Sequence, residues 1–122
     1  MNSRNAYPFE KLRVWESARP LTKKVYGLTR SFSRAEIYGL ISQLNRASIS
    51  VAANLAEGSA RTSRKHQAHF SQIAYGSLME LACLLIIAVD LEYLSAGGES
   101  RFPEEIEEIS RRPNALRNAQ LS

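Results

Sequence analysis

The sequence predicts an all-α protein, an antiparallel four-helix bundle, and three observations support this fold class. Apolar residues recur at helical spacing along most of the 122 residues, which is typical of amphipathic helices. Short turns separate the helical stretches, and short connections make consecutive helices antiparallel neighbours. The third stretch is apolar on nearly every side over residues 81–89, so its outer face should also be covered. We therefore expect a single domain, residues 1–122, that associates with further copies of itself.

The first predicted helix spans residues 9–32 and follows an irregular or disordered N-terminus, residues 1–8. Its apolar residues alternate in steps of four and three: Val14, Ala18, Leu21, Val25, Leu28 and Phe32. Pro20 lies inside this stretch, and because it lacks a backbone N–H it should bend the helix near Ala18. We expect one continuous helix with a bend.

The second predicted helix, residues 34–57, is the element around which the bundle is organised. Ser33 and Glu36 have the spacing of a capping box, in which the Glu36 carboxylate bonds back to the amide of Ser33. Gly58 is placed as the stop at the carboxyl end. Six residues form one apolar stripe at helical spacing: Ile37, Leu40, Leu44, Ala47, Val51 and Leu55.

A polar row runs beside this stripe, formed by Gln43, Arg46, Ser50, Asn54 and Glu57. Buried polar side chains need partners, since each unpaired one costs about 1–3 kcal/mol. We interpret the row mainly as a structural polar network between helices or subunits. Binding of a carboxylate or a base edge by the same residues stays open as the alternative.

The third predicted helix spans residues 64–94, with Ser63 as its cap, and the fourth spans 103–121, interrupted by Pro113. Seven residues give the third helix a heptad seam: Phe70, Ile73, Ser77, Leu81, Leu84, Ala88 and Leu91. Cys83 is the single cysteine. It lies within the apolar run, so we expect it to be a buried small hydrophobe.

The charge is unevenly distributed around a formal net charge of +4. Residues 1–66 hold 12 Lys and Arg against 4 Asp and Glu, whereas residues 67–122 hold 4 against 8. A basic half and an acidic half suit either a polyanion partner or head-to-tail self-association. Solvated helix faces are the alternative explanation.

Nothing in the sequence predicts export or membrane insertion. The first residues lack the apolar core of a signal peptide. The longest apolar run, Leu81 to Val89, is much shorter than the roughly 20 residues that a membrane span needs. We expect a cytoplasmic protein with no membrane partner.

Several short motifs together resemble a known family. They are FEKLRVW at 9–15, YGL at 38–40, SQL at 42–44, NLAEG at 54–58, and IAYGSL at 73–78 followed by Glu80 and Leu81. This set resembles the bacterial four-helix-bundle family named for proteins encoded in 23S rRNA intervening sequences. It is more distantly similar to the accessory variability determinant of diversity-generating retroelements. The likeness covers roughly residues 9–94.

The resemblance implies an up-down-up-down bundle that assembles as a homo-oligomeric ring, a homopentamer, with no enzymatic activity and with nucleic acid as a partner. The sequence departs from the family pattern at three positions. Asn45 stands where a second basic residue usually lies beside Arg46, which weakens a phosphate contact there. Ala52 replaces a frequent helix-kinking proline, so the second helix should be straighter. Pro113 stands where an apolar residue is usual, which should shorten the last helix.

The motifs that usually mark enzymes are absent from the sequence. It has no glycine-rich phosphate loop, no Gly-x-Ser-x-Gly motif, no Cys/His pairing and no carboxylate pair at a likely cleft. His66 and His69 are spaced to share a metal, but no third ligand lies nearby, and two ligands do not make a selective zinc site. We expect no enzyme, no cofactor and no metal.

The best candidate site is the basic turn at Arg61, Ser63, Arg64 and Lys65. It precedes a helix whose free amides and dipole favour anions. Repeated around a ring, the turn would hold a phosphate backbone by charge alone, without reading sequence. The first hypothesis is therefore a non-catalytic scaffold that binds RNA or DNA. The alternatives are a protein-interaction hub that docks a partner such as a polymerase, a solvated turn without function, and a small-molecule binder that uses Arg46, Asn54 and Glu57.

Overall fold

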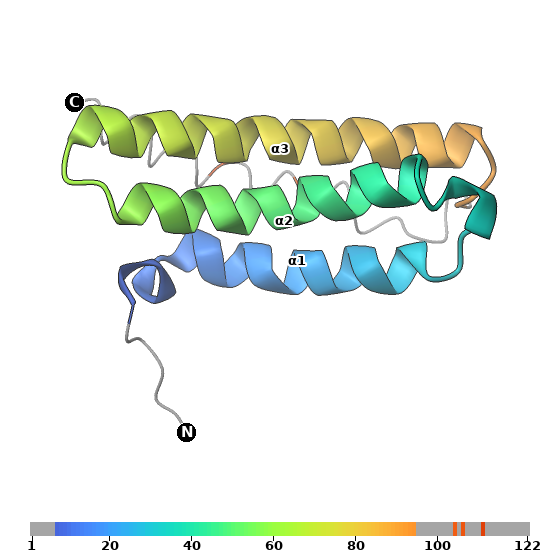
Figure 1. Ribbon diagram of the computed structural model, residues 1–122, viewed down its shortest axis with the longest axis horizontal. Helices are drawn as coiled ribbons and strands as arrows, with labels where there is room; N and C mark the ends of the chain where they lie inside the picture. The colour runs from blue at the N-terminus through green and yellow to red at the C-terminus, as the bar shows by residue number, and fades with distance from the viewer. Residues whose placement is uncertain (1–6, 95–103, 105, 107–110, 112–122) are drawn as a thin grey trace, which may run out of the picture.

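The computed structural model describes residues 7–94 together with Glu104, Ile106 and Arg111. Figure 1 shows three long helices, α1 (Arg13–Thr29), α2 (Leu40–Ser59) and α3 (Arg64–Asp90), and two short 3₁₀ helices, Pro8–Lys11 and Arg34–Glu36. No strand occurs in this part of the chain, so the all-α prediction is confirmed. Most of the predicted fourth helix, residues 103–121, and its interruption at Pro113 lie outside the described residues.

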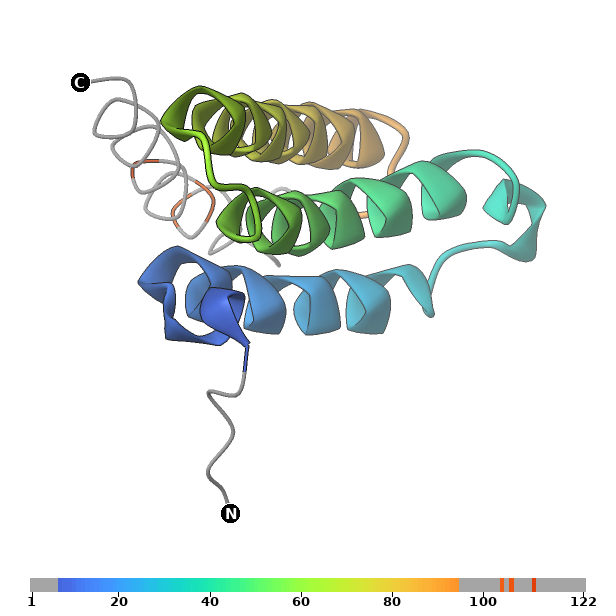
Figure 2. The same cartoon turned by 60° about the vertical axis from the view of Figure 1, so that its left-hand side comes forward.

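The three long helices run antiparallel, with α2 between α1 and α3 (Figures 1 and 2). Each helix turns one apolar face inward, and the core draws on all three. The fully buried side chains include Ala18, Leu21 and Val25 from α1, Leu44 and Val51 from α2, and Ala74, Leu78, Leu81 and Ala88 from α3. Ile106 joins the same cluster. Burial of this apolar surface is the main stabilising contribution to the fold.

The first predicted helix consists of two elements instead of one. Leu12 has an extended conformation (φ −82°, ψ 123°) and separates the 3₁₀ helix Pro8–Lys11 from α1. Pro20 lies inside α1 without ending it. Pro20 is exposed on the outer side of the helix, where the carbonyl left without its usual amide partner can bond to water. The chain leaves α1 at Thr29, three residues before the predicted end.

The second helix begins at Leu40, not at residue 34 as predicted, because Glu36 has a different role. Its carboxylate accepts hydrogen bonds from the Leu40 amide and from the Tyr93 hydroxyl, both at 3.1 Å. The capping box is therefore wrong, although the Ser33 hydroxyl does accept from the Ala35 amide at 3.2 Å. Ile37 precedes α2 and is 40% exposed, so it does not belong to the apolar stripe.

Gly58 does not act as the predicted helix stop, because α2 continues to Ser59. No described glycine has a positive φ. A Cβ atom at Gly58 would lie 2.8 Å from the Cβ of Phe70 and 3.4 Å from the carbonyl oxygen of Gln67. Glycine is required here because α3 approaches the backbone of α2 closely, not because the chain turns.

The third helix ends at Asp90, four residues before the predicted end. Glu92 has a left-handed conformation (φ 66°). The amides of Glu92 and Tyr93 donate to the carbonyls of Val89 and Ala88, both at 2.9 Å, which is the Schellman pattern. Leu91 was predicted to belong to the seam, but because it follows the end of the helix it is 55% exposed. Ile73, another predicted seam residue, is also exposed.

Candidate functional site

The basic turn joins α2 to α3 at one end of the molecule (Figure 1). Ser63 begins α3 by accepting a hydrogen bond from the His66 amide at 3.3 Å, as expected for an N-cap. The Gln67 side-chain amide donates to the Arg61 carbonyl at 2.8 Å. These two bonds hold the turn against the first turn of α3 and fix where its charged side chains start.

The cations of the basic turn differ in what they contact. The Arg61 guanidinium lies 2.9 Å from the Glu57 carboxylate and 5.0 Å from the centre of the Phe70 ring. Arg64 and Lys65 are exposed. Neither side chain forms a hydrogen bond or an ion pair with another described residue. The turn therefore presents two unpartnered positive charges, beside a third that already has a carboxylate partner.

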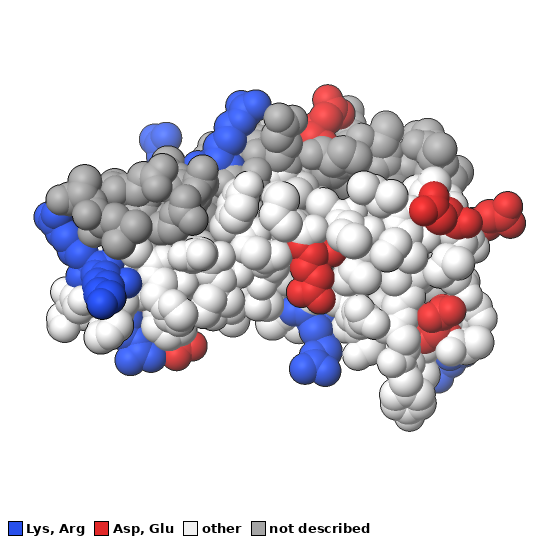
Figure 3. Space-filling view, turned by 90° about the horizontal axis from the view of Figure 1, so that it is seen from above, with Lys and Arg blue, Asp and Glu red and all other residues white. Residues whose placement is uncertain are grey.

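Charge is segregated along the molecule. Figure 3 shows Lys and Arg side chains gathered at the end where α2 joins α3, and Asp and Glu side chains at the opposite end of the same face. Acidic and basic side chains also lie between the two ends, so the segregation is partial. Arg30 and Arg34 lie near the other connection, between α1 and α2, so they do not join the basic turn within one chain.

The predicted polar row is divided in the structure. Ser50 lies at its centre, with its hydroxyl 2.8 Å from the Ser77 hydroxyl on α3. The Asn54 amide donates to the Ser50 hydroxyl at 2.9 Å and to its carbonyl at 2.8 Å. The side chains of Gln43 and Arg46 are exposed and form no hydrogen bond or ion pair with a described residue. The structure thus brings Ser50 and Asn54 together at the α2–α3 contact and leaves the side chains of Gln43 and Arg46 in solvent. Glu57, the last member of the row, is paired with Arg61 instead.

The two histidines of α3 are both exposed, and His69 contacts Phe70 edge-on, with ring centres 5.3 Å apart. No three His, Cys, Asp or Glu side chains gather within the described part of the chain.

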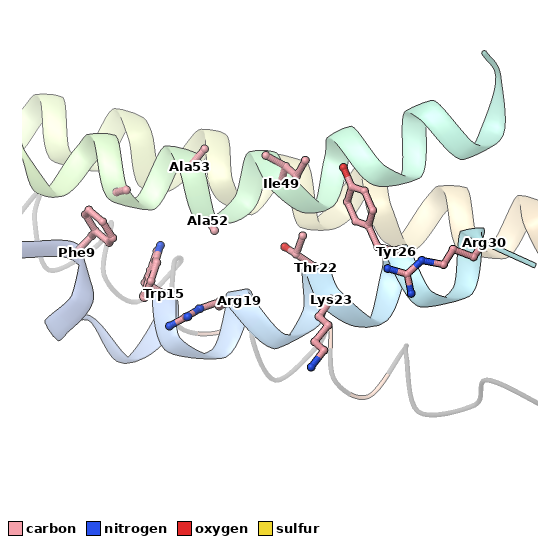
Figure 4. Close-up of a pocket in the computed structure, with 11 residues that line it drawn as sticks. Phe9, Trp15, Arg19, Thr22, Lys23, Tyr26, Arg30, Ile49, Ala52 and Ala53 are labelled. Atoms are coloured by element: carbon pink, nitrogen blue, oxygen red, sulfur yellow. The ribbon is translucent and has the colours of Figure 1, made fainter. Parts of the chain in front are cut away.

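A groove between α1 and α2 was not expected from the sequence. It has a volume of about 580 Å³. In Figure 4 the Trp15 and Tyr26 side chains rise from α1 toward α2, over a floor that α2 forms with Ile49, Ala52 and Ala53. The lining residues are Phe9, Trp15, Arg19, Thr22, Lys23, Tyr26, Arg30, Ile49, Ala52, Ala53 and Ala56.

The groove has a basic edge that α1 supplies. The Arg19 guanidinium lies 5.4 Å from the centre of the Trp15 ring, and Lys23 and Arg30 continue the line along the helix. No acidic residue of the described part of the chain lines the groove. A signal was present in the sequence, because residues 15, 19, 23, 26 and 30 follow one helical line.

The outer face of α3 is a second exposed apolar surface, on the helix whose apolar run at residues 81–89 predicted that its outer face would be covered. We define it by the exposed residues Gly76, Met79, Glu80, Cys83, Ile86, Ile87 and Asp90. Ile86 is 63% exposed. Cys83 is exposed, which contradicts the expected burial, because it follows Met79 by one helical turn on the solvent side. By length and composition, α3 could also cross a membrane, with a mean hydropathy of 1.8 over 18 residues, but core helices of soluble proteins meet the same criterion.

Comparison with known protein families gives a match over most of the chain. A family model described as 23S rRNA-intervening sequence protein matches residues 10–115, which include all of α1, α2 and α3. No curated protein matches the chain. The family match agrees with the resemblance carried by the motifs between residues 9 and 81.

Proposed function

Because the chain belongs to the 23S rRNA-intervening sequence protein family, we propose that it is a non-catalytic oligomeric scaffold that binds RNA or DNA. The contact is made by the basic turn, which a homopentameric ring would display five times. The family description names a ribosomal RNA sequence and no reaction. The sequence itself contains none of the catalytic motifs sought above, which supports a binding role over an enzymatic one.

The observation that carries this proposal is the pair of exposed, unpartnered cations at Arg64 and Lys65. They lie in the first turn of α3, where the helix dipole also favours an approaching anion. Each cation that neutralises a phosphate releases a condensed counterion, so binding weakens steeply with salt. Two cations on one chain bind weakly. A ring turns the same two charges into a multivalent surface.

Arg61 contributes less than its neighbours in this scheme. Its guanidinium would have to share or leave the Glu57 carboxylate at 2.9 Å before it could contact a phosphate. Ser63 is engaged as the cap of α3, so its role is to position the turn. No base-reading side chain is involved, and the affinity should therefore be almost independent of nucleotide sequence.

The test compares the variant Arg64→Ala/Lys65→Ala with wild-type protein for binding to fluorescent RNA and DNA oligonucleotides of unrelated sequence. Fluorescence anisotropy over a salt series gives the slope of log K against log salt. We expect the slope to fall by about 0.7–0.9 for each phosphate contact that is lost. The matched control, Arg34→Ala/Arg46→Ala, removes two exposed arginines that lie outside both the basic turn and the α1–α2 groove, and it should keep the wild-type slope.

Two outcomes would contradict the proposal. The turn variant could bind as tightly as wild type over the whole salt series. Alternatively, both double variants could lose the same affinity, which would mean that net charge, and not the basic turn, governs binding.

A protein-interaction hub is the second candidate, and the outer face of α3 favours it. Isolated apolar side chains are normal on a protein surface, but contiguous ones mark interaction sites. Purification from the native host under mild conditions distinguishes the two functions. One additional protein at fixed stoichiometry, without absorbance from nucleic acid, would favour the hub.

A further inference from the structure

Two surfaces of the chain remain apolar and exposed, and they lie on different helices. One is the α1–α2 groove, with its floor at Ile49, Ala52 and Ala53 (Figure 4). The other is the outer face of α3, where Met79, Ile86 and Ile87 are each more than a third exposed. In Figure 1 α1 and α3 lie on opposite sides of α2, so the two surfaces do not cover each other within one chain.

We propose that the α1–α2 groove of one copy receives the outer face of α3 from the next copy. This inference rests on the oligomeric scaffold proposed above and names the surfaces that join its subunits. Contiguous apolar surface of this kind is unfavourable in water, and pairing the two surfaces removes both from solvent.

The charges that border the two surfaces are opposite in sign. The groove is bordered by Arg19, Lys23 and Arg30, and none of the described residues that line it is acidic. The outer face of α3 carries Glu80 and Asp90, both exposed and without an ion pair to any described residue. Complementary charge of this kind orients the partners and disfavours pairing of either surface with a copy of itself.

The spacing of these charges also agrees. At about 1.5 Å per residue, Arg19 and Arg30 lie about 16 Å apart along α1, and Glu80 and Asp90 lie about 15 Å apart along α3. Both acidic groups can therefore approach the two arginines while the apolar residues between them cover the floor of the groove. The side chains of the groove floor at Ala52, Ala53 and Ala56 are small, which allows a helix to approach closely.

The two surfaces differ, so the contact is head-to-tail. When copies join through unlike surfaces, one groove and one α3 face remain free at the two ends of the growing assembly. These two free surfaces can be covered only when the ends meet and close a ring. An interface between two identical patches would instead stop at a dimer. The uneven charge of the two halves of the chain is consistent with the head-to-tail arrangement.

Lipid and nucleic acid are the other possible occupants, and the observations favour neither. Glu80 interrupts the outer face of α3 with a charge, which is unfavourable inside a bilayer. The floor of the groove is formed by alanine and isoleucine, which offer no hydrogen bond to a phosphate backbone or a base edge.

Mixing two defective variants tests the proposal. Arg19→Glu/Ile49→Glu breaks the groove and keeps the α3 face, whereas Ile86→Lys breaks the α3 face and keeps the groove. All three side chains are exposed in the single chain, so each variant should retain the helix content seen by circular dichroism. Tyr38→Lys, at a side chain that is 94% exposed and outside both surfaces, is the matched control.

Sedimentation velocity gives the masses. We expect wild type and Tyr38→Lys to form the same oligomer, and each defective variant to sediment as a single chain of 13.7 kDa. An equimolar mixture of the two defective variants should form a dimer and nothing larger, because each mixed pair retains one intact groove and one intact face.

Cross-linking provides a second measurement that does not depend on destabilised variants. Cys83 is exposed on the outer face of α3. Adding Ala53→Cys in the groove should give a ladder of disulfide-linked dimers, trimers and larger species under mild oxidation. The control Thr62→Cys, in the exposed turn after α2, should give no such ladder.

Different failures have different meanings. A monomeric wild type would overturn both the oligomeric scaffold and this inference. An oligomeric wild type whose two defective variants also remain oligomeric would overturn the groove–α3 contact alone. So would a mixture that forms no dimer, or a groove variant that keeps the wild-type oligomer and loses oligonucleotide binding instead.

Discussion

The two sides of α2 are packed in different ways. On the side of α3, the helices approach so closely that no Cβ fits at Gly58, where it would lie 2.8 Å from the Cβ of Phe70. A direct hydrogen bond of 2.8 Å also joins Ser50 of α2 to Ser77 of α3. Small residues at the contact make this close approach possible, and the α2–α3 contact is complete within one chain.

On the side of α1, two hydrogen bonds join α1 to the backbone or a side chain of α2, and a groove lies along the two helices. The Thr22 hydroxyl donates to the Ser48 carbonyl at 3.1 Å, and the Thr29 hydroxyl donates to the Asn45 side chain at 2.9 Å. The groove of about 580 Å³ lies along the same pair of helices. Large side chains on the edge of α1, Trp15 among them, form one wall of this groove.

The difference separates residues that stabilise the single chain from residues that are free to contact another molecule. Substitutions on the α3 side of α2 should lower the free energy of unfolding. Substitutions in the groove should change that free energy little and affect assembly instead.

The largest expected effect is at Gly58. The variant Gly58→Ala should lower the free energy of unfolding by about 1–3 kcal/mol, because the new methyl group overlaps Phe70 and the helices must move apart. The gain in helix propensity, about 1 kcal/mol, does not compensate for that overlap. Urea unfolding measures the change.

Gly27 provides the control for this prediction. A Cβ at Gly27 on α1 would have no heavy atom within 4 Å. Gly27→Ala should therefore stabilise the protein by about 0.5–1 kcal/mol. If both variants shifted the urea midpoint in the same direction, the close α2–α3 contact would be refuted.

A smaller effect is expected from the hydrogen bonds on the two sides. Ser77→Ala removes the bond to Ser50 from a buried site and should cost about 0.5–1.5 kcal/mol. Thr22→Val removes the bond to Ser48 beside the open groove, where water can replace the hydroxyl, and should change stability by less than about 0.5 kcal/mol. Equal losses, measured by thermal and urea unfolding, would mean that the two sides are equally closed.

The smallest effect is expected at the end of the α2–α3 pair, where Tyr93 stacks on Phe32 with ring centres 5.1 Å apart and donates to Glu36. Burial raises the pKa of Tyr93 above its ordinary value of 10.0, and the hydrogen bond and charge of Glu36 act in the same direction. Since the folded state favours the neutral phenol, its contribution is present below pH 10 and is lost as pH rises through the raised pKa.

The variant Tyr93→Phe keeps the ring and removes this titration. Its Tm should be slightly below that of wild type at pH 7, and the difference should shrink or reverse above pH 10. The other tyrosines titrate in both proteins, so the difference between the two Tm curves isolates Tyr93. A constant difference from pH 7 to pH 11 would contradict the role given to Glu36.

Periodicity predicted the helical regions and most of the core, because burial of one face dominates the choice of residues along a helix. Leu44, Val51 and Leu55 were expected on one stripe and are all buried. The turn between α2 and α3 and the cap at Ser63 also follow from local sequence. These features depend only on contacts between residues a few positions apart.

The features that sequence reasoning missed depend on distant residues. Glu36 bonds to Tyr93, 57 positions away, so the local capping box could not show its partner. Gly58 resembles a helix stop until Phe70 is placed beside it. The groove depends on the separation of α1 and α2, which no periodicity encodes. Within the candidate site, the charges of the basic turn and the i,i+4 spacing of Glu57 and Arg61 follow from local sequence. The structure adds that the two side chains are paired at 2.9 Å, which competes with the use of Arg61 in binding.

The left-handed conformation of Glu92 has a consequence for where α3 ends. Leu91 and Leu94 would allow the helix another turn, yet the chain reverses at Glu92, which has a left-handed conformation. A non-glycine residue adopts this conformation at a cost of about 1 kcal/mol or more. The next residue, Tyr93, stacks on Phe32 with ring centres 5.1 Å apart and donates a hydrogen bond to Glu36 at 3.1 Å. These contacts tie the end of the longest helix to the connection between α1 and α2, and we expect the helix to continue past Asp90 when they are removed.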